Sequence, residues 1–339
     1  MRVKGEGPVP SRIMLVGEAP GEKEEAAGVP FVGASGQELN RMLAEAGIMR
    51  SECYVTNVCK VRPPANQISA WIALKKKDIT PAHKLLRDRY CLPQIHEGYA
   101  ELLQEIEMVQ PNIIVAFGNL SMWALTGQWG VLKWRGSLLG GKDGPKVIPT
   151  IHPAAVLREW SQRAVVLNDL RRVKRHMTSR TYDNRPDWNF IVRPSFDRAW
   201  NVLQSLQDKL DHNTNETWID FDIETRSGHI ACVGLSWSKL DAICIPLMTT
   251  SSREGYFSAA EEAQIVWKLY QVLTHKRVKV RWQNGLFDAQ YVYRHWHFIP
   301  RGAQDTMISQ HSVFAALPKS LAFIASMYSD FYVYWKDDK

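Results

Sequence analysis

The sequence predicts an α/β protein built from two domains in series. Its 339 residues exceed what one ordinary hydrophobic core holds. In the first half, short apolar runs alternate with helical patterns, whereas in the second half several strand patterns follow one another. We therefore expect a parallel sheet between layers of helices over residues 1–177, and a mixed sheet over residues 188–339.

The first half contains four short apolar runs typical of buried parallel strands. They cover residues 12–16, 53–58, 112–117 and 146–151. The helical patterns cover residues 35–47, 90–109, a segment that ends at Leu125, and residues 165–176. Because strands separated by helices cross over in one direction, these elements predict a parallel sheet with helices on both faces.

Periodicity lapses over residues 178–187, which we interpret as a linker. The patterns beyond it predict helices at 195–210 and 259–273 and strands at 218–223, 230–237, 242–247 and 278–283. Short connections at Ser227-Gly228 and around Lys239 join the first three of these strands as hairpins. A mixed sheet with an antiparallel part follows from this order.

The composition is that of a globular protein, with 45% hydrophobic and 23% charged residues. No run approaches the roughly 18 apolar residues of a membrane span, so no membrane partner is expected. Residues 1–7 lack the apolar stretch of a secretory signal. Five cysteines show no paired framework, which favours a reducing cytoplasm. The net charge of +7 favours a polyanionic partner, although charge alone is weak evidence.

A glycine-rich loop with a carboxylate follows the first predicted strand. It runs Gly17-Glu18-Ala19-Pro20-Gly21 and continues to Gly33 around Phe31. Open α/β sheets bind ligands at the carboxyl ends of their strands, where Glu18 is expected to lie. Taken alone, the loop equally fits a turn with a solvated acid, and His152-Pro153 fits an ordinary turn.

Four separated segments together resemble the family 4 uracil-DNA glycosylases. They are residues 17–36, Tyr-Val-Thr-Asn-Val at 54–58, Arg-Pro-Pro at 62–64 and Ile-His-Pro-Ala at 151–154, in that family's order. The resemblance spans about residues 1–176. It implies a parallel-sheet α/β/α domain that hydrolyses the N-glycosyl bond of uracil in single- or double-stranded DNA.

The resemblance gives each candidate residue a role. Glu18 and His152 are the expected catalytic residues: Glu18 orients water and balances a cationic sugar, and His152 donates a hydrogen bond to uracil O2. Phe31 is expected to stack on the extruded base, and Asn57 to recognise N3–H and O4. Alone, Phe31 also fits a core aromatic and Asn57 a strand-end cap. The other expected uracil-binding residues are Gly17 and Ala19.

One departure from that family concerns its cofactor. Family 4 members hold an iron–sulfur cluster through four cysteines, two of them near the amino terminus. Here no cysteine precedes Cys53, and Val61 stands where the third ligand is expected. Only Cys91 matches a ligand position. Because the cluster needs four thiolates, no iron–sulfur cluster is expected.

A second departure is a longer connection between residues 64 and 91. It carries Lys75, Lys76 and Lys77, and we expect these lysines and Arg62 to contact DNA phosphates. A related group of glycosylases traps uracil-DNA through a histidine in this region. His83 lacks the neighbouring sequence of that group, which favours a solvated basic loop.

Two carboxylates lie two residues apart in a predicted strand of the second half. Asp222 and Glu224 therefore point to the same face of the sheet. They repel each other unless a cation lies between them, which is the arrangement of two-metal phosphodiester cleavage. Taken alone, the pair also fits an exposed acidic strand.

The surrounding segments resemble the 3′–5′ exonuclease domain of family A DNA polymerases, a DEDD-type nuclease with a ribonuclease H-like mixed sheet. Asp222 and Glu224 match its first motif, and Asp288 in Asn-Gly-Leu-Phe-Asp matches its second. Asp305-Thr306-Met307 matches a segment that is not a metal ligand. The resemblance implies that Asp222, Glu224 and Asp288 bind magnesium or manganese if the domain is active.

The third motif of that family, Tyr-x-x-x-Asp, is missing. Tyr334 and Asp338 have the bare spacing but follow the expected helix at Leu321 too soon. We therefore expect the amino-terminal part of a family A polymerase, bacterial or phage, in the cytoplasm of a bacterial or infected cell. Its exonuclease is expected to be inactive, and the polymerase domain is an expected partner. The alternatives are a non-catalytic uracil-sensing or DNA-binding module and an enzyme whose only activity is nuclease.

Overall fold

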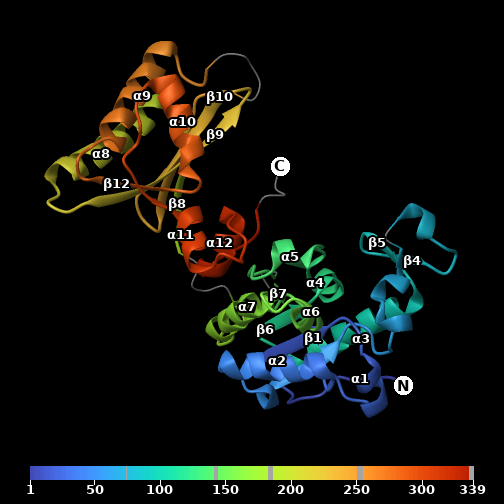
Figure 1. Cartoon of the computed structure of the whole chain (residues 1–339). Helices are drawn as coiled ribbons and strands as arrows, with labels where there is room; N and C mark the ends of the chain where they lie inside the picture. The colour runs from blue at the N-terminus through green and yellow to red at the C-terminus, as the bar shows by residue number, and fades with distance from the viewer. Residues whose placement is uncertain (74, 141–143, 182–185, 250–254, 336–339) are drawn as a thin grey trace. The chain divides into compact units, whose positions relative to one another are not determined.

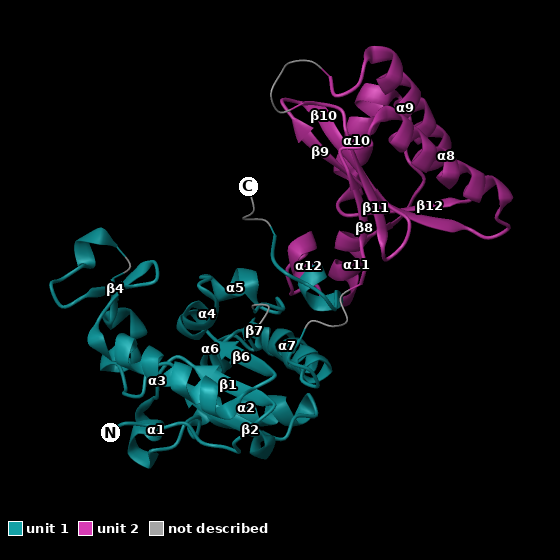
Figure 2. Cartoon of the chain, turned by 180° about the vertical axis from the view of Figure 1, so that it is seen from behind, with its two compact units in different colours: residues 1–184, 325–339 teal, residues 185–324 magenta. Residues whose placement is uncertain are grey.

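The computed structural model describes residues 1–73, 75–140, 144–181, 186–249 and 255–335. The chain forms two compact units, which are residues 1–184 with 325–339 and residues 185–324 (Figure 2). The sequence-based division differs because it assigned all of residues 188–339 to the second domain. No helix within the described ranges is long and apolar enough to cross a membrane.

Unit 1 is built on a parallel sheet, as predicted. Its strand order is β2-β1-β6-β7, with β1 (Ile13–Gly17), β2 (Cys53–Asn57), β6 (Ile113–Phe117) and β7 (Lys146–Thr150). Every residue of these strands is buried, because helices cover both faces of the sheet (Figure 1). Because the four strands are parallel, their carboxyl ends lie at one edge of the sheet.

The helices of unit 1 follow the predicted order, with one clear correction. They are α1 (Glu22–Ala27), α2 (Ala34–Glu45), α3 (Pro93–Val109), α4 (Asn119–Thr126), α5 (Val131–Trp134), α6 (Pro153–Arg158) and α7 (Gln162–His176). The helix predicted from residue 90 begins at Pro93, a residue suited to the first helical position. Residues 89–91 instead form a strand.

The long connection of unit 1 carries a small antiparallel sheet that the sequence did not reveal. Its order is β3-β5-β4, with β3 (Ile72–Ala73), β4 (Lys84–Leu86) and β5 (Arg89–Cys91). Strands of two or three residues are too short to show a period of two, so periodicity did not predict them.

Unit 2 contains a six-stranded mixed sheet in the order β13-β12-β9-β10-β11-β8. The strands are β8 (Asn189–Val192), β9 (Thr217–Arg226), β10 (His229–Ser236), β11 (Asp241–Pro246), β12 (Val278–Trp282) and β13 (Gly302–Asp305). Strand β10 pairs antiparallel with both β9 and β11, and the remaining pairs are parallel. The predicted mixed sheet and both hairpins are thus confirmed.

One face of this sheet packs on helices and the other carries the acidic pair. The helices of unit 2 are α8 (Phe196–His212), α9 (Ala259–Leu273), α10 (Gly285–Trp296) and α11 (Thr306–Val313), and α12 (Leu321–Tyr328) follows. Ile219, Phe221 and Ile223 of β9 share a core with residues of α8 and α9. Asp222 and Glu224 alternate with them and are exposed on the opposite face.

Candidate active site

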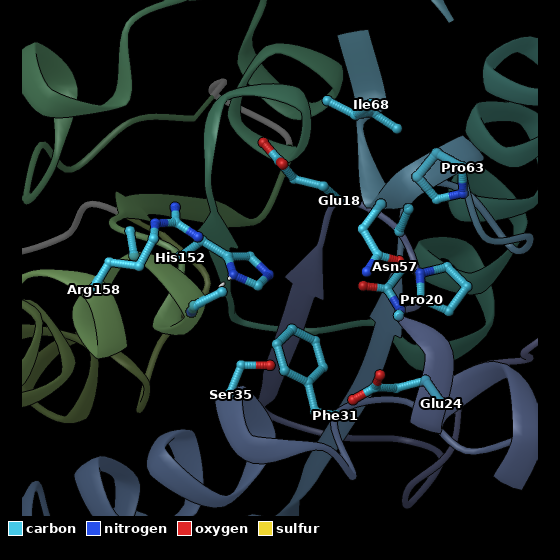
Figure 3. A pocket seen from close by; sticks show the side chains of 15 residues that line it. Glu18, Pro20, Glu24, Phe31, Ser35, Asn57, Pro63, Ile68, His152 and Arg158 are labelled. Carbon is cyan, nitrogen blue, oxygen red and sulfur yellow. Dashed lines mark hydrogen bonds between the residues drawn. The ribbon is translucent and has the colours of Figure 1, made fainter. Parts of the chain in front are cut away.

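The carboxyl edge of the parallel sheet brings four predicted residues around one cavity. Glu18, Phe31, Asn57 and His152 all line a space of about 380 Å³ (Figure 3). Glu18 follows β1, Asn57 ends β2 and His152 follows β7. Ala19 also lines the cavity. The other lining residues, to which the sequence analysis gave no role, include Pro20, Gly21, Glu24, Ser35, Pro63, Asn66, Ile68, Ala155 and Arg158.

Asn57 presents a polar atom that has no partner within the described part of the chain. Its side chain is buried, yet Oδ1 accepts no hydrogen bond. Gly17 leaves room for the Asn57 side chain, since a Cβ on residue 17 would lie 2.6 Å from Phe31 Cζ and collide with Asn57 Oδ1. An unpaired buried acceptor costs about 1–3 kcal/mol, so the arrangement favours a ligand that donates to Asn57.

Phe31 is held in a backbone conformation that L residues rarely adopt. Its φ of 56° lies in the left-handed region, a strain that the surroundings must fix. Glu24 provides this support, because its Oε1 accepts the N–H groups of Val32 (3.1 Å) and Gly33 (2.8 Å). The ring of Phe31 lies 5.8 Å from the ring of His152, with the planes 25° apart. The pair thus forms an aromatic wall of the cavity.

His152 is a neutral hydrogen-bond donor in this setting. It caps α6, and its Nδ1 accepts the N–H of Ala154 at 3.1 Å. The proton of the neutral ring is therefore on Nε2. Burial, with a smaller effect of Arg158, lowers the pKa of His152 to about 4, while Glu24 opposes the shift. At neutral pH the ring offers an uncharged N–H.

Glu18 lies at the amino-terminal end of α4. Its Oε1 accepts the N–H of Leu120 at 2.9 Å. Burial raises the pKa of this carboxyl above its usual range, while the backbone hydrogen bonds of Leu120 and Asn119 act in the opposite direction. Gly118 leaves the necessary room, because a Cβ there would lie 2.8 Å from Glu18 Cδ. A carboxylate with a raised pKa is suited to accept a proton from water.

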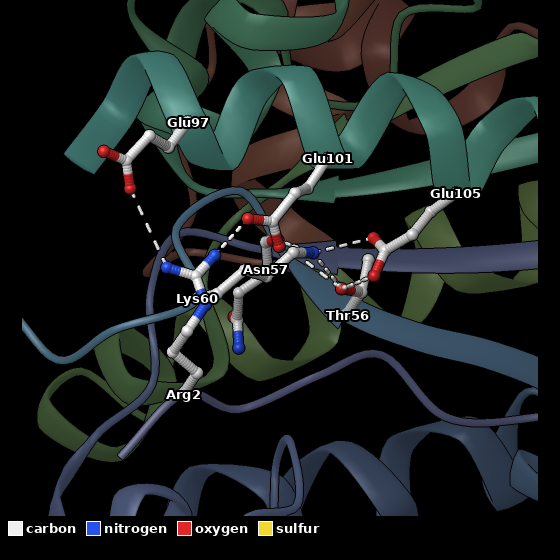
Figure 4. A network of polar contacts seen from close by, with 7 residues as sticks. All are labelled: Arg2, Thr56, Asn57, Lys60, Glu97, Glu101 and Glu105. Atoms are coloured by element: carbon white, nitrogen blue, oxygen red, sulfur yellow. Dashed lines mark hydrogen bonds and ion pairs between the residues drawn. The ribbon is translucent and has the colours of Figure 1, made fainter. Parts of the chain in front are cut away.

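A buried ion pair fixes the backbone of Asn57 from behind (Figure 4). Lys60 Nζ donates to the carbonyl of Asn57 at 2.8 Å, to Thr56 Oγ1 at 2.7 Å and to Glu105 Oε2 of α3 at 2.7 Å. Burial lowers the pKa of Lys60, and the carboxylate of Glu105 counteracts this. This role of Lys60 was not predicted from the sequence, since an isolated lysine is usually exposed.

The predicted DNA-contacting residues lie outside the cavity. Arg62 forms an ion pair with Glu22 at 3.2 Å. Lys75, Lys76 and Lys77 are exposed in the long connection and do not line the cavity. Their contacts with DNA stay predictions.

The cysteines of unit 1 are free and buried. They are Cys53, Cys59 and Cys91. Burial raises the pKa of Cys53 and Cys59 to about 12 and that of Cys91 to about 11, so each holds its proton as a neutral thiol. The expected lack of an iron–sulfur cluster stays a prediction.

The three carboxylates predicted to bind metal in unit 2 come from β9 and α10, and their metal binding stays a prediction. Asp222 and Glu224 lie side by side on β9, and burial together with Glu224 raises the pKa of Asp222. Asp288 of α10 is buried and its Oδ1 accepts the N–H of Ile223 at 3.0 Å. Within the described ranges no three His, Cys, Asp or Glu side chains could hold a metal ion. Asp338 lies outside those ranges.

Asp305 has a structural role instead. Its carboxylate accepts backbone N–H groups of Asn284 (3.1 Å), Gly285 (2.8 Å) and Met307 (2.8 Å). It thereby caps α11 and fixes the start of α10, which is consistent with its expected position outside the ligand set.

Comparisons with known proteins agree with this geometry. Residues 4–172 match the uracil DNA glycosylase superfamily. The type-4 uracil-DNA glycosylase of Thermotoga maritima is 37% identical over 176 residues, which cover 51% of this chain and 81% of that protein. The type-4 enzyme of Pyrobaculum aerophilum is 36% identical over 179 residues, 50% of this chain and 79% of its own. The chain belongs to the uracil-DNA glycosylase superfamily.

Three further similarities concern other classes of protein. A DNA polymerase of Bacillus phage SP01 is 31% identical over 169 residues, 50% of this chain and 16% of that polymerase. RNase D of Escherichia coli, an exoribonuclease, aligns with a TM-score of 0.32 and 14% identity over 45% of this chain and 36% of its own. NrnC of Brucella melitensis with bound Mg²⁺ aligns with a TM-score of 0.27 and 15% identity, over 35% of this chain and 56% of that one.

Removal of the buried ammonium is expected to destabilise unit 1. The substitution Lys60→Met keeps the side-chain length but leaves Glu105 without its cation, which costs about 3–5 kcal/mol in the free energy of unfolding. Denaturant unfolding followed by fluorescence measures the change. The double variant Lys60→Met/Glu105→Leu is expected to recover most of the loss, and an unchanged midpoint in Lys60→Met would contradict the network.

The protonation of His152 is expected to set part of the pH dependence of stability. Because its pKa is about 4 when folded and about 6.5 when unfolded, the unfolded chain binds more protons in between. The contribution of neutral His152 to the free energy of unfolding is therefore fully present above pH 6.5, and it is lost as the pH falls toward 4. NMR titration, with His152→Gln to identify the signal, is expected to show a neutral ring with its proton on Nε2 at pH 6. A midpoint near 6.5 would refute the assignment.

Proposed function

We propose that unit 1 releases uracil from DNA by hydrolysis of the N-glycosyl bond. The observation that carries the proposal is the convergence of Glu18, Phe31, Asn57 and His152 on one cavity (Figure 3), together with the buried Oδ1 of Asn57, which accepts no hydrogen bond from a described residue. The similarity to type-4 uracil-DNA glycosylases supports it. The substrate is DNA with the uracil turned out of the stack, at a cost of a few kcal/mol.

The chemistry follows from the atoms around the cavity. The bond between C1′ and N1 breaks and its electron pair leaves with the uracil. His152 Nε2–H donates a hydrogen bond to O2, where negative charge gathers. A water oxygen bonds to C1′, and Glu18 accepts the proton of that water. Glu18 also balances the positive charge that develops on the sugar.

Selection of uracil over cytosine depends on Asn57. Its Oδ1 accepts N3–H and its Nδ2 donates to O4. Cytosine has an acceptor at N3 and donors at N4, so two buried polar groups would be left unpaired on each side. Lys60 and Gly17 keep the amide in place, the first through the backbone and the second through the room it leaves.

Uracil release by the unmodified chain is the direct test. A single-stranded oligonucleotide with one uracil is expected to yield free uracil, whereas the same oligonucleotide with cytosine is not. Glu18→Gln and His152→Ala are each expected to lower kcat on the order of a hundredfold. Glu107→Gln, an exposed change on α3, is the matched control and is expected to be active.

Other outcomes of that assay distinguish the alternatives. Tight binding of the uracil oligonucleotide without release of uracil would refute the proposed hydrolysis and favour a uracil-sensing module. Full activity of Glu18→Gln would refute the assignment of Glu18 as the proton acceptor.

We also propose that the chain works as the amino-terminal part of a DNA polymerase in a bacterial or phage-infected cytoplasm. The phage SP01 polymerase supports this, since half of this chain is similar to it. The polymerase domain would then be a covalent partner, and uracil would be examined where DNA is copied. A synthesis assay with primed DNA is expected to detect no nucleotide addition by residues 1–339 alone.

Nuclease activity is not expected from unit 2. The Tyr-x-x-x-Asp motif, which supplies the fourth metal ligand in the nucleases that unit 2 resembles, is missing from the sequence. A 5′-labelled oligonucleotide with magnesium or manganese is therefore expected to keep its length. Metal-dependent 3′ shortening that is lost in Asp222→Ala would overturn this expectation.

A further inference from the structure

A short segment near the end of the chain is built into unit 1. The chain leaves unit 1 at residue 184 and returns at residue 325; we call residues 325–335 the closing segment. Tyr332 in this segment is only 3% exposed, and its carbonyl accepts the N–H of Leu138 at 2.9 Å. Ser137 Oγ accepts the N–H of Tyr334 at 3.1 Å. These contacts fix the backbone of the segment at two points.

The closing segment also supplies acceptors to two buried guanidinium groups. Arg135 Nη1 donates to Ser326 Oγ at 2.6 Å, and Arg172 donates to the carbonyl of Ser329. Both arginines are almost fully buried, and burial lowers the pKa of Arg172 to about 10. Because a buried cation is costly unless it is hydrogen-bonded, these acceptors are part of what permits the burial.

The same network reaches the strand that carries His152. Asp169 of α7 is fully buried and accepts Arg135 Nε at 2.9 Å and Thr150 Oγ1 at 2.7 Å. Thr150 is the last residue of β7, two positions before His152. Nearby, the N–H of Gly136 donates to the carbonyl of Pro149 at 2.9 Å. The end of β7 is thus held from the side of the closing segment.

No side chain other than that of glycine fits at the centre of this arrangement. A Cβ on Gly136 would lie 2.8 Å from Asp169 Oδ1 and 3.3 Å from the carbonyl of Ser326. Its φ of 74° is also left-handed. Gly136, the Asp169 carboxylate and the closing segment are therefore closely packed.

We propose that the closing segment is a working part of the glycosylase site, and that Asp169 is the positioning residue through which it holds His152. The inference rests on the proposed function for the role of His152. The match to the superfamily ends at residue 172, so the closing segment lies outside the part shared with it.

The test compares two tyrosines of the same segment in the full chain. Tyr332→Ala removes the buried ring, whereas Tyr328→Ala changes a side chain that is 60% exposed and serves as the matched control. In Tyr332→Ala we expect faster hydrogen exchange over 325–335 and a His152 titration midpoint raised by about half a pH unit, since water reaches the loosened strand end. We expect kcat to fall about tenfold with KM unchanged, and Tyr328→Ala to match the unmodified chain.

If hydrogen exchange in the segment is faster but the His152 titration and kcat are unchanged, the proposal is overturned. The segment would then only attach the end of the chain to unit 1. Ser326→Ala deletes one acceptor of Arg135 and is the milder variant if Tyr332→Ala does not fold; the same shifts are expected in smaller size. The His152 titration needs no turnover. A chain that releases no uracil would therefore refute the proposed function without deciding this measurement.

Discussion

The parallel register of the sheet in unit 1 is the constraint on which the site depends. Gly17 pairs with Asn57 across β1 and β2, and Phe117 pairs with Thr150 across β6 and β7. The residues that follow these pairs are thereby placed at one edge although they are far apart in sequence. A slip of one residue would turn each side chain to the opposite face and take the cavity apart.

The polar groups at this edge are partly or fully shielded from water before any ligand arrives. Backbone N–H groups at the ends of two helices partly offset the cost for Glu18 and His152, and a carboxylate does so for Lys60. Asn57 Oδ1 is the exception, since no described residue donates to it. Groups fixed in this way need little reorganisation during the reaction, which is the main source of electrostatic stabilisation in enzymes.

Features that depend on residues close together in the sequence were predicted from it. The four buried strands show as apolar runs, and the glycine-rich loop, the Asn57 segment and the His-Pro pair keep a recognisable order. Glu24 was not identified because it stands in an acidic run, Glu-Lys-Glu-Glu, whose members look alike until the fold buries one of them.

Long-range pairing accounts for the other differences. Nothing in the sequence around Ser326 or Tyr332 indicates that their partners lie more than a hundred residues earlier. The periodicity of apolar residues predicts only local secondary structure. The domain boundary drawn from the linker therefore placed these residues with the second unit. In unit 2, spacing correctly put Asp222 and Glu224 on one face, but it could not show that the Asp288 carboxylate is bound to a backbone amide.

The return of the chain to unit 1 has a consequence for biosynthesis. Domains usually fold in the order in which the ribosome makes them. Here Arg135 and Arg172 lack the acceptors on Ser326 and Ser329 until residues 185–324 have been translated and residues 325–335 emerge. A nascent chain that stops early therefore carries an unfinished first unit, and only translation through both units yields a closed one.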